Sequence, residues 1–536
     1  MRYQIPLNKW DFSIEPLNYH EKVTIPHTWN VTDEVMKYRG IASYKTDLFI
    51  DPSFKNKRVF LSFQAVYHTA QVYINDSLAG SHKHSGFTPF RIEVTDWIHF
   101  GETNTIQVNA DNTHIDEMLP QDGHFDWADD GGMIRNVSLQ FMENDAIEYM
   151  QVSETFHIMD AAQCSGTFHI QTAFFDKRPH DVVVSVIDYH NNHTKIQKAF
   201  PSVVDQINLD FQDLLLWNID APHLYRIVLE TGNDRLEQRI GLRSIEVKGE
   251  QILLNQKEIY LKGCEWMPGS HPDFGMAEPF EHSIFRLRQL KNAGCIFTRF
   301  HWQQDDSLFD WCDENGLLVQ EEIPYWGFPK EATPLQLTIA KQQASEMVYF
   351  HSQHPSIIFW GVGNELGAHC ETTIQYVEDM KSYFKSLDSM RLVNYVSNTL
   401  SLVSNIDKDD ATLHGDVAMW NDYLGLWEPS DDIENHAIRT AKKAKGMPLI
   451  VSEFGLCEPH FTGGDPARYE LLQQRIELYN KIENIKGYVW FSLNDYRTHC
   501  GEAGEDKFRQ RIHGSTDLYG NEKPSYRLLC SLPSPF

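Results

Sequence analysis

The stretch "FWGVGNELGAHC" (359–370) decides the fold, because it begins as a continuous apolar run and then presents Asn364 and Glu365 side by side. A strand buried on both faces has such a continuous run, whereas a strand with one solvated face alternates apolar and polar residues. Similar runs recur after about residue 247, and the eight in chain order span 260–266, 295–300, 317–322, 357–365, 392–396, 416–420, 448–453 and 487–493. We therefore predict eight buried parallel strands in this half of the chain.

Amphipathic helices separate several of these runs. In the segment 281–294, Ile284, Leu287 and Leu290 share one helical face, and Gly294 is a typical C-terminal stop. Eight strands with helical crossovers predict a (β/α)8 TIM barrel, whose chemistry lies at the C-terminal ends of the strands. An open doubly wound sheet is the alternative topology, but no glycine-rich phosphate loop follows any of the runs.

The first half of the chain has a different pattern of apolar residues. Apolar residues alternate with polar ones in "RVFLSF" (58–63), "QVYIND" (71–76) and "NTIQVNA" (104–110), which is typical of antiparallel strands in a β-sandwich. A second strand-rich block includes "DVVVSVIDYHNN" (181–192) and residues 224–247. Its length of roughly 100 residues suits an immunoglobulin-like sandwich. The sequence thus predicts a multidomain protein with two β-sandwiches before the barrel.

The net charge and the hydropathy of the chain limit the kinds of partner that the protein can bind. The 536 residues contain 47 basic and 75 acidic side chains, a net charge of −28, which repels nucleic acid and acidic membrane surfaces. No apolar stretch approaches the roughly 20 residues that a membrane span needs. We expect neither nucleic acid nor a membrane as a partner, and the sequence leaves open whether the chain forms a homo-oligomer.

Cysteine and histidine spacing indicate the compartment and the absence of a cofactor. The eight cysteines contain no CxxC pair, which predicts neither a zinc cluster nor a dense disulfide framework and fits a reducing compartment. The segment 1–16 lacks the basic and apolar regions of a signal peptide, so we expect a cytoplasmic protein, or a periplasmic or secreted one if a signal was removed. No HExxH motif or closely spaced histidine pair lies on a recognisable helix face, so we expect no metal and no cofactor.

Two glutamates end predicted barrel strands. Glu365 ends the fourth run and Glu453, in "LIVSEFG", ends the seventh, so both carboxylates would face the same barrel mouth. A single glutamate at a strand end is more often a cap or a salt-bridge partner. Two carboxylates held close together repel, however, so that one keeps its proton and can act as an acid. Such a pair is what the cleavage of a glycosidic bond requires.

The sequence around these glutamates resembles glycoside hydrolase family 2, the family of β-galactosidases, β-glucuronidases and β-mannosidases. "GVGNE" is followed by "SEFG", in which Glu453 lies 88 positions after Glu365. Further segments resemble the family in the same order, namely 23–30, 81–96, 131–139, 241–247 and 298–322. The resemblance implies a jelly-roll, sugar-binding-type β-sandwich over 1–143, an immunoglobulin-like β-sandwich over 144–246 and a catalytic TIM barrel over 247–536.

The resemblance also implies roles for site residues. Glu365 would be the acid/base and Glu453 the nucleophile of a retaining double displacement, with the two carboxyl groups roughly 5 to 5.5 Å apart. Asn364 would hydrogen-bond the sugar 2-hydroxyl. The remaining residues that would contact the substrate, each with an ordinary structural role as its alternative, are Asp126, Arg299, His301, Tyr423 and Trp490.

Two departures from the family pattern concern the sugar. The family's usual "HYP" is "HWQ" at 301–303, and the Asn-x-Lys motif of its glucuronidases is replaced by "GEDKFRQRIHG" (504–514). Lys507, Arg509 and Arg511 in that loop are candidates to grip a substrate carboxylate, although adjacent acidic residues also fit a self-paired loop.

We therefore expect an exo-acting β-glycosidase that releases single terminal sugars from a glycoside or oligosaccharide substrate, with a β-galactosidase favoured. A β-hexuronidase, either a β-glucuronidase or a β-galacturonidase, is the alternative. A non-catalytic carbohydrate-binding protein is the third hypothesis, but the loss of a glutamate or of Asn364 that would indicate it has not occurred.

Overall fold

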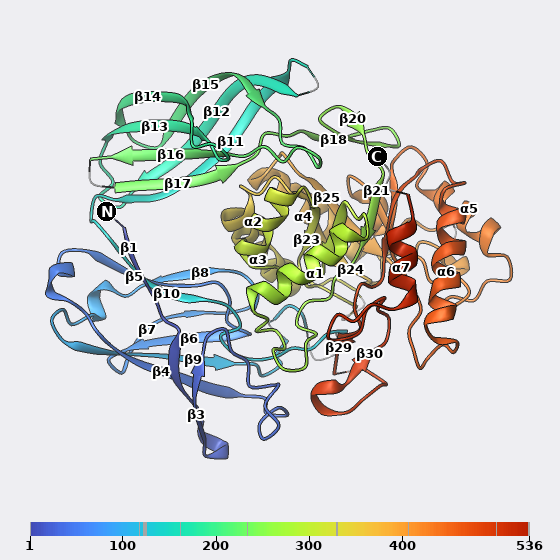
Figure 1. The fold of residues 1–536 in the computed structure, drawn as a ribbon, viewed down its shortest axis with the longest axis horizontal. Helices are drawn as coiled ribbons and strands as arrows, with labels where there is room; N and C mark the ends of the chain where they lie inside the picture. Colours follow the sequence, from blue (N-terminus) through green and yellow to red (C-terminus); the bar gives the residue numbers. More distant parts are fainter. Residues whose placement is uncertain are drawn as a thin grey trace.

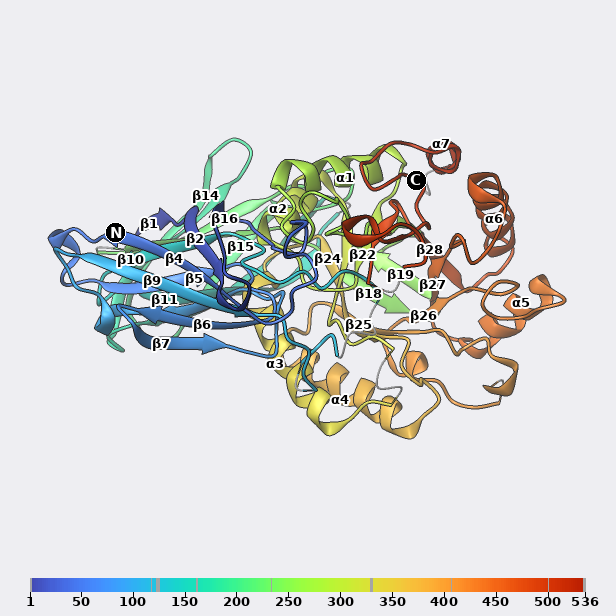
Figure 2. The same ribbon diagram turned by 90° about the horizontal axis from the view of Figure 1, so that it is seen from below.

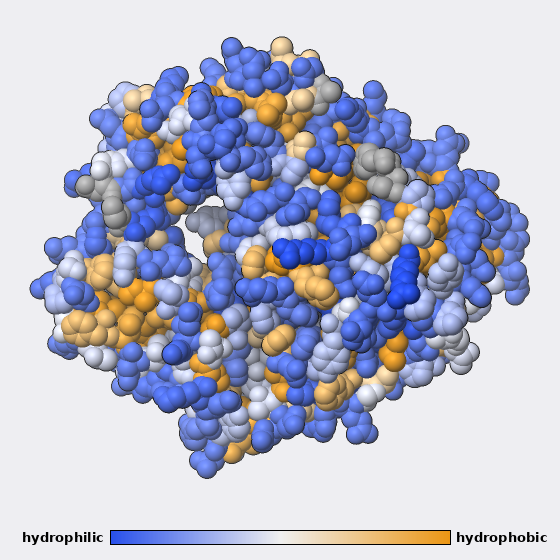
Figure 3. Space-filling view, viewed as in Figure 1, coloured by the Kyte–Doolittle hydropathy of each residue, from blue (hydrophilic) through white to orange (hydrophobic). Residues whose placement is uncertain are grey.

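A computed structural model describes residues 2–116, 118–121, 126–160, 162–232, 234–327, 331–405, 407–499 and 501–533. Two β-sandwiches lie to one side of a closed barrel, and the turned view shows both on that same side (Figures 1 and 2). Hydrophilic residues dominate the face in Figure 3, and apolar side chains form patches over the first sandwich. In the part of the chain that the structure describes, no helix is long and apolar enough to cross a membrane.

The first sandwich consists of two antiparallel sheets with strand orders β1-β10-β5-β8 and β3-β2-β4-β9-β6-β7. Its strands are β1 (Tyr3–Pro6), β2 (Lys9–Ile14), β3 (Tyr19–Thr24), β4 (Ile41–Phe49), β5 (Arg58–Phe63), β6 (Thr69–Ile74), β7 (Ser77–His82), β8 (Phe90–Glu93), β9 (Thr103–Asp111) and β10 (Val137–Met142). Alternate residues of β9, among them Ile106 and Val108, are buried between the sheets. The period-two pattern of the sequence therefore marks the inner face of the sandwich, as predicted.

The second sandwich has a three-stranded sheet, β11-β12-β15, and a four-stranded sheet, β14-β13-β16-β17. The strands are β11 (Ile147–Ile158), β12 (Gln163–Phe174), β13 (His180–Asp188), β14 (Thr194–Val203), β15 (Gln206–Leu215), β16 (Tyr225–Thr231) and β17 (Asp234–Ile240). Val182, Val184 and Val186 of β13 lie in its core. We propose 143/144 and 246/247 as the domain boundaries, because one sheet system ends and the next begins close to each of them.

Eight parallel strands form the closed barrel, and each of the eight predicted runs overlaps one of them. They are β21 (Leu261–Cys264), β22 (Phe297–Phe300), β23 (Leu318–Glu322), β24 (Ile357–Asn364), β25 (Leu392–Ser397), β26 (Ala418–Asn421), β27 (Leu449–Phe454) and β28 (Ile485–Trp490). The fold class predicted from the sequence is confirmed. A small sheet of β18 (Ile245–Lys248), β19 (Gln251–Leu254) and β20 (Lys257–Glu258) precedes the barrel and packs against the buried side chains at the start of its strands.

Helices cover the outside of the barrel. They are α1 (Phe280–Asn292), α2 (Asp306–Asn315), α3 (Pro334–His351), α4 (Glu371–Leu387), α5 (Ile433–Lys443), α6 (Gly464–Tyr479) and α7 (Pro524–Ser531). Between β25 and β26 the described residues form two short 3-10 turns instead of a full helix. In α1 the predicted face of Ile284, Leu287 and Leu290 is buried, and the chain leaves the helix through Gly294 with a positive φ of 69°.

Buried polar contacts attach the first sandwich to the barrel mouth. Arg135 donates to the carbonyl oxygens of Phe87 at 2.6 Å and Gln303 at 2.5 Å, which connects the two units. Arg497 of the barrel forms an ion pair of 2.6 Å with Asp130 of the sandwich. Charged groups buried in this way are costly to separate, because each would lose its partner. The sandwich loop that follows β9 is therefore held against the C-terminal ends of the barrel strands.

Candidate active site

A cavity of about 380 Å³ lies at the C-terminal mouth of the barrel, and both predicted catalytic glutamates line it. Glu365 follows β24, and Glu453 belongs to β27, so the fourth and seventh strands bring them to one place as expected. Asp126 and Trp127 of the first sandwich form part of the same wall. The site is thus built from two units of the chain.

The backbone at the end of β24 turns sharply. All eight residues of the strand are buried, and Gly363 has a φ of 154°, a conformation that favours glycine. Glu365 has a φ of 58°, which an ordinary side chain adopts at a cost of about 1–3 kcal/mol. Its backbone N–H donates to the carbonyl oxygen of Val396 at 3.0 Å, and this bond holds the turn. A strained backbone conformation persists only where the surrounding structure enforces it, and such conformations are concentrated at functional sites.

Glu365 is a carboxyl group that keeps its proton near neutral pH. Burial raises its pKa to about 7, and the negative charge of Glu453 acts in the same direction. The side-chain amide of Asn421 donates to Glu365 Oε1 at 2.7 Å and opposes the shift in part.

Glu453 has the opposite environment. Burial alone would raise its pKa, but hydrogen bonds and positive charge from His301 and Arg299 outweigh burial and lower the pKa to about 2. Arg299 Nη1 lies 2.7 Å and His301 Nε2 3.3 Å from Glu453 Oε1, and the hydroxyl of Tyr423 donates to Oε2 at 3.0 Å. The site therefore contains one protonated and one ionised carboxyl group at the same pH.

Two acidic residues that the sequence analysis missed hold the cations in place. Glu322, at the end of β23, accepts two hydrogen bonds from Arg299 at 3.0 and 3.1 Å. Glu265, directly after β21, accepts a hydrogen bond from His301. Burial lowers the pKa of His301, but the charge of Glu265 outweighs it and raises the pKa to about 10. Their position at strand ends is the one signal by which the sequence could have identified them.

Two amides complete the floor of the site. Asn364 is buried and accepts a hydrogen bond of 3.3 Å from Asn421, whose own side-chain oxygen accepts one from the hydroxyl of Ser452 at 2.9 Å. The Asn364 amide nitrogen lies 3.5 Å from His301 Nε2. Asn364 therefore lies beside His301 and Asn421, and Asn421 itself was not predicted.

Asp126 reaches the cavity from the first sandwich and meets a basic residue of the barrel. Tyr496 donates to Asp126 Oδ2 at 2.7 Å, and Arg511 Nε lies 2.9 Å from Oδ1. Burial raises the pKa of Asp126 to about 6, while the charge of Arg511 opposes the rise. Arg511 is the basic residue of the 501–511 loop that lines the cavity.

The structure corrects three predictions about side chains near the cavity. Trp490 is fully buried, donates to the hydroxyl of Ser515 at 2.8 Å and packs between the barrel and its helices, so it forms no sugar platform. Its neighbour Phe491 lines the cavity instead, because successive residues of an extended chain point to opposite sides.

The other two corrections concern the basic loop. Lys507 lies 3.4 Å from Asp273 and does not line the cavity, and Arg509 is exposed and donates to the carbonyl oxygen of His499 at 3.2 Å. Of the three basic residues in this loop, only Arg511 points into the site. The loop sequence has no periodic pattern from which this could be predicted.

Two groups of acidic and histidine side chains have the spacing of metal ligands, but each already contains a cation. Glu265, His301 and Glu453 surround the guanidinium group of Arg299. Asp310, Asp313 and His354 lie beside Arg239 of β17, which donates to Asp310. A positive charge at the centre of a group opposes the entry of a metal ion, so neither supports a metal site.

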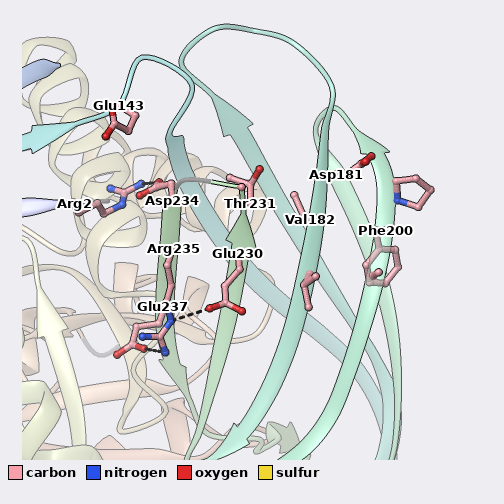
Figure 4. Close-up of a pocket in the computed structure, with 14 residues that line it drawn as sticks. Arg2, Glu143, Asp181, Val182, Phe200, Glu230, Thr231, Asp234, Arg235 and Glu237 are labelled. Atoms are coloured by element: carbon pink, nitrogen blue, oxygen red, sulfur yellow. Dashed lines mark hydrogen bonds and ion pairs between the residues drawn. The ribbon is translucent and has the colours of Figure 1, made fainter. Parts of the chain in front are cut away.

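A larger cavity of about 1040 Å³ lies on the outer face of the four-stranded sheet of the second sandwich (Figure 4). Its charged groups pair with one another, since Arg235 contacts Glu237 at 2.9 Å and Glu230 at 3.6 Å, and Arg2 contacts Asp234 at 2.9 Å. Both arginines of this surface are already paired with carboxylates, and none of its residues shows the contrast between an acid and an ionised carboxylate that the barrel mouth provides.

A TIM barrel with a protonated and an ionised glutamate at its mouth has the architecture of the glycoside-cleaving hydrolases. Two sequence profiles of one family match the chain, namely "Glycosyl hydrolases family 2, sugar binding domain" over residues 7–142 and "Glycosyl hydrolases family 2, TIM barrel domain" over residues 245–503. The chain belongs to glycoside hydrolase family 2 and is a glycoside hydrolase.

The names of the related proteins give more than one enzymatic activity. A β-galactosidase of Thermoanaerobacterium thermosulfurigenes is 27% identical over 97% of this chain and 74% of its own length. A β-glucuronidase of Bacteroides fragilis is 27% identical over 84% of this chain and 67% of its own.

Solved structures show the same fold. A β-D-glucuronidase of Dictyoglomus thermophilum has a TM-score of 0.88 at 21% identity, covering 99% of this chain and 98% of its own. A family 2 β-galacturonidase of Eisenbergiella tayi has a TM-score of 0.84 at 22% identity, covering 99% and 96%.

Proposed function

We propose that the protein is a retaining, exo-acting β-glycosidase, with Glu365 as acid/base and Glu453 as nucleophile. The observation that carries this proposal is the contrast between two glutamates of one cavity: Arg299 and His301 lie 2.7 and 3.3 Å from Glu453 Oε1, whereas Glu365 Oε1 accepts a hydrogen bond from the neutral amide of Asn421 at 2.7 Å. The surroundings therefore lower the pKa of Glu453 and raise that of Glu365 to about 7. Glu453 attacks the anomeric carbon while Glu365 protonates the leaving oxygen, and a glycosyl-enzyme forms. Glu365 then removes a proton from water, which releases the sugar with its original anomeric configuration.

Other side chains support these two steps. Arg299 and His301 keep Glu453 ionised and fix one of its oxygens, while Tyr423 holds the other. Asn364 lies beside Asn421, which lines the cavity, and we assign its amide to the sugar 2-hydroxyl, an interaction that strengthens in the transition state. The exo mode is supported by Asp126 and Trp127, because the first sandwich closes part of the cavity that a long internal polysaccharide segment would need.

We propose a neutral β-galactoside as the substrate. Arg511 faces the cavity, but Asp126 already neutralises its charge. A substrate carboxylate would have to displace Asp126 from Arg511 or lie beside a like charge, whereas a sugar hydroxyl finds both a donor and an acceptor there. The relative named β-galactosidase, which aligns over almost the whole chain, is consistent with this choice.

A β-hexuronide is the second candidate, because Arg511 is a fixed cation in the cavity and several relatives are named β-glucuronidases. An arginine can bind a carboxylate through two parallel hydrogen bonds.

A panel of nitrophenyl β-galactoside, β-glucuronide, β-galacturonide and β-mannoside will decide between the two candidates. We expect kcat/KM for the galactoside to exceed that for either uronide by about tenfold or more, which corresponds to about 1.4 kcal/mol. Arg511→Gln should lower the rate for all sugars together, and Arg509→Gln, which changes an exposed arginine of the same loop, should leave it unchanged. Faster cleavage of a uronide, with selective loss of that activity in Arg511→Gln, would reverse the assignment.

Activity should depend on pH through the acid. Because Glu365 must carry its proton before the first step, kcat/KM should fall as the pH rises through about 7. The lower limb should lie at acidic pH, where Glu453 takes up a proton. Asn421→Ala removes a hydrogen bond that lowers the pKa of Glu365, so the upper limb should move to higher pH in this variant. An upper limb that stays in place after this change would contradict the assignment of Glu365.

We also keep the cytoplasm as the proposed compartment. The seven cysteines that the structure describes are free thiols, most of them buried, whereas Cys500 lies outside the described residues. Free thiols of this kind suit a reducing environment.

A further inference from the structure

An exposed tryptophan stands at the rim of the catalytic cavity. Trp427, in the loop between β26 and α5, lines the cavity although 43% of its surface is exposed. Its ring is tilted against that of His460, with centroids 4.2 Å apart, and edge-on to Phe461 at 4.8 Å. A hydrogen bond of 2.6 Å from Gly425 N–H to the carbonyl oxygen of Glu428 closes the loop beneath it. The indole is therefore supported on one side and open on the other.

The position of Trp427 corresponds to the leaving-group side of the reaction. If the protein is an exo-glycosidase, as proposed above, the terminal sugar occupies the enclosed part of the cavity beside Asp126 and the buried Trp127. The rest of the substrate must then extend toward the part of the wall that is open to solvent. The open face of Trp427 lies along that part of the wall, where an aromatic ring can stack against a ligand.

Two polar groups near this rim have acceptor atoms without a donor. Asn398 Oδ1 and Glu428 Oε1 are buried and have no hydrogen-bond partner among the described residues, and His436 Nε2 lies 3.7 Å from Glu428 Oε1 but is bonded to the carbonyl oxygen of Ser401 at 2.7 Å. Both residues line the cavity. An unsatisfied buried acceptor costs about 1–3 kcal/mol, and a ligand hydroxyl would remove this cost.

We propose that Trp427, Asn398 and Glu428 form a subsite for a second sugar ring, so that the preferred leaving group is a pyranose. A pyranose offers an apolar face of C–H groups to the indole and hydroxyl donors to the two acceptors, whereas an alkyl group offers neither a flat face nor donors. An aryl group stacks but donates nothing unless it carries a hydroxyl. The inference rests on the proposed glycosidase function and adds the chemical class of the leaving group.

The experiment compares two substrates with the same terminal sugar, lactose and β-galactosyl fluoride, or the matching uronide pair if the substrate panel selects a uronide. Fluoride leaves without occupying the rim. We expect Trp427→Ala to lower kcat/KM for the disaccharide by about threefold to tenfold, the range that an aromatic contact contributes. The fluoride should react at the wild-type rate, and Trp427→Phe should restore most of the loss. Tyr349→Ala, which removes an exposed aromatic ring from α3, is the matched control.

A second variant separates a sugar from an aromatic leaving group. Asn398→Leu should slow cleavage of the disaccharide but not of the nitrophenyl glycoside, which has a flat face and no hydroxyl. Equal losses on disaccharide and fluoride in Trp427→Ala, or no loss on either, would overturn the subsite, and so would an Asn398→Leu variant that cleaves lactose normally.

If the wild-type protein cleaves neither substrate, the proposed function fails, and calorimetry of disaccharide binding still tests the rim. Binding that Trp427→Ala weakens supports the subsite, whereas no binding, or binding that Trp427→Ala leaves unchanged, overturns it.

Discussion

Glu453→Ala will abolish turnover of every glycoside, whether the leaving group is a good or a poor one. If Glu453 is the nucleophile, no covalent intermediate can form without its carboxylate, and neither Arg299 nor His301 can replace it, because both are positively charged. Loss of a residue that acts in a covalent mechanism lowers kcat by roughly 10⁴-fold or more. Initial rates on nitrophenyl glycosides whose phenols differ in acidity measure the effect, which should be similar for all of them.

The fold should survive the change, because Arg299 keeps two hydrogen bonds to Glu322 when Glu453 is lost. Glu453→Gln, which keeps the shape of the side chain, provides a second variant. Glu434→Ala, on the exposed face of α5, is the matched control. Azide, a small anion, should enter the space left in Glu453→Ala and give the α-glycosyl azide. A Glu453→Ala variant that retains a normal rate on activated substrates would remove Glu453 from the mechanism.

The barrel could be predicted from the sequence because its strands are buried on both faces. The run at 357–365 contains β24, whose residues are all buried, and each of the other runs overlaps a strand of the barrel. A strand that is buried on both faces needs apolar side chains at successive positions, so it is visible in the sequence as a continuous apolar run. The sequence predicts helices between several of the runs, and between β25 and β26 the described residues form two short 3-10 turns. The domain boundaries were predicted from the positions at which the spacing of apolar residues in the sequence changes.

The site could be predicted only in part. Glu365 and Glu453 were identified because glycoside cleavage needs two carboxylates in one site. Each of them ends a predicted strand, and the ends of the barrel strands meet at one mouth. Glu265 and Glu322 also follow or end strands, but nothing in one sequence distinguishes an acid that holds Arg299 or His301 from one that pairs elsewhere. Their role becomes visible only through the distances across the barrel.

The incorrect predictions have a geometric cause. Trp490 and Phe491 are neighbours, and a shift of one residue moves a side chain from the cavity to the outer layer of the barrel. In the basic loop, Arg511 faces the cavity whereas Arg509 does not, and the loop has no period from which this could be inferred. Residues in regular strands are therefore predicted better than residues in the loops that determine specificity.

Glu365→Ala will separate substrates by their leaving groups. Aryl glycosides with acidic phenols should still form the glycosyl-enzyme at a rate close to that of the wild type, because their leaving oxygen hardly needs a proton. Disaccharides, whose leaving alcohol is a poor one, should lose roughly 10²- to 10⁴-fold in kcat/KM, the range attributed to general acid catalysis. Hydrolysis of the intermediate should slow for every substrate, since Glu365 also activates water. A burst of phenol followed by a slow steady state measures both steps.

Added azide tests the same variant from the other direction. Azide needs no base, so it should react with the glycosyl-enzyme of Glu365→Ala and give the β-glycosyl azide, the opposite anomer from that expected with Glu453→Ala. The first step should also lose the decrease in rate above pH 7, because the group with a pKa of about 7 is gone. In the wild-type enzyme, NMR of the first product should show the retained β-anomer. An inverted anomer, or two variants that respond alike to leaving-group acidity, would mean that Glu365 and Glu453 do not divide the reaction as acid and nucleophile.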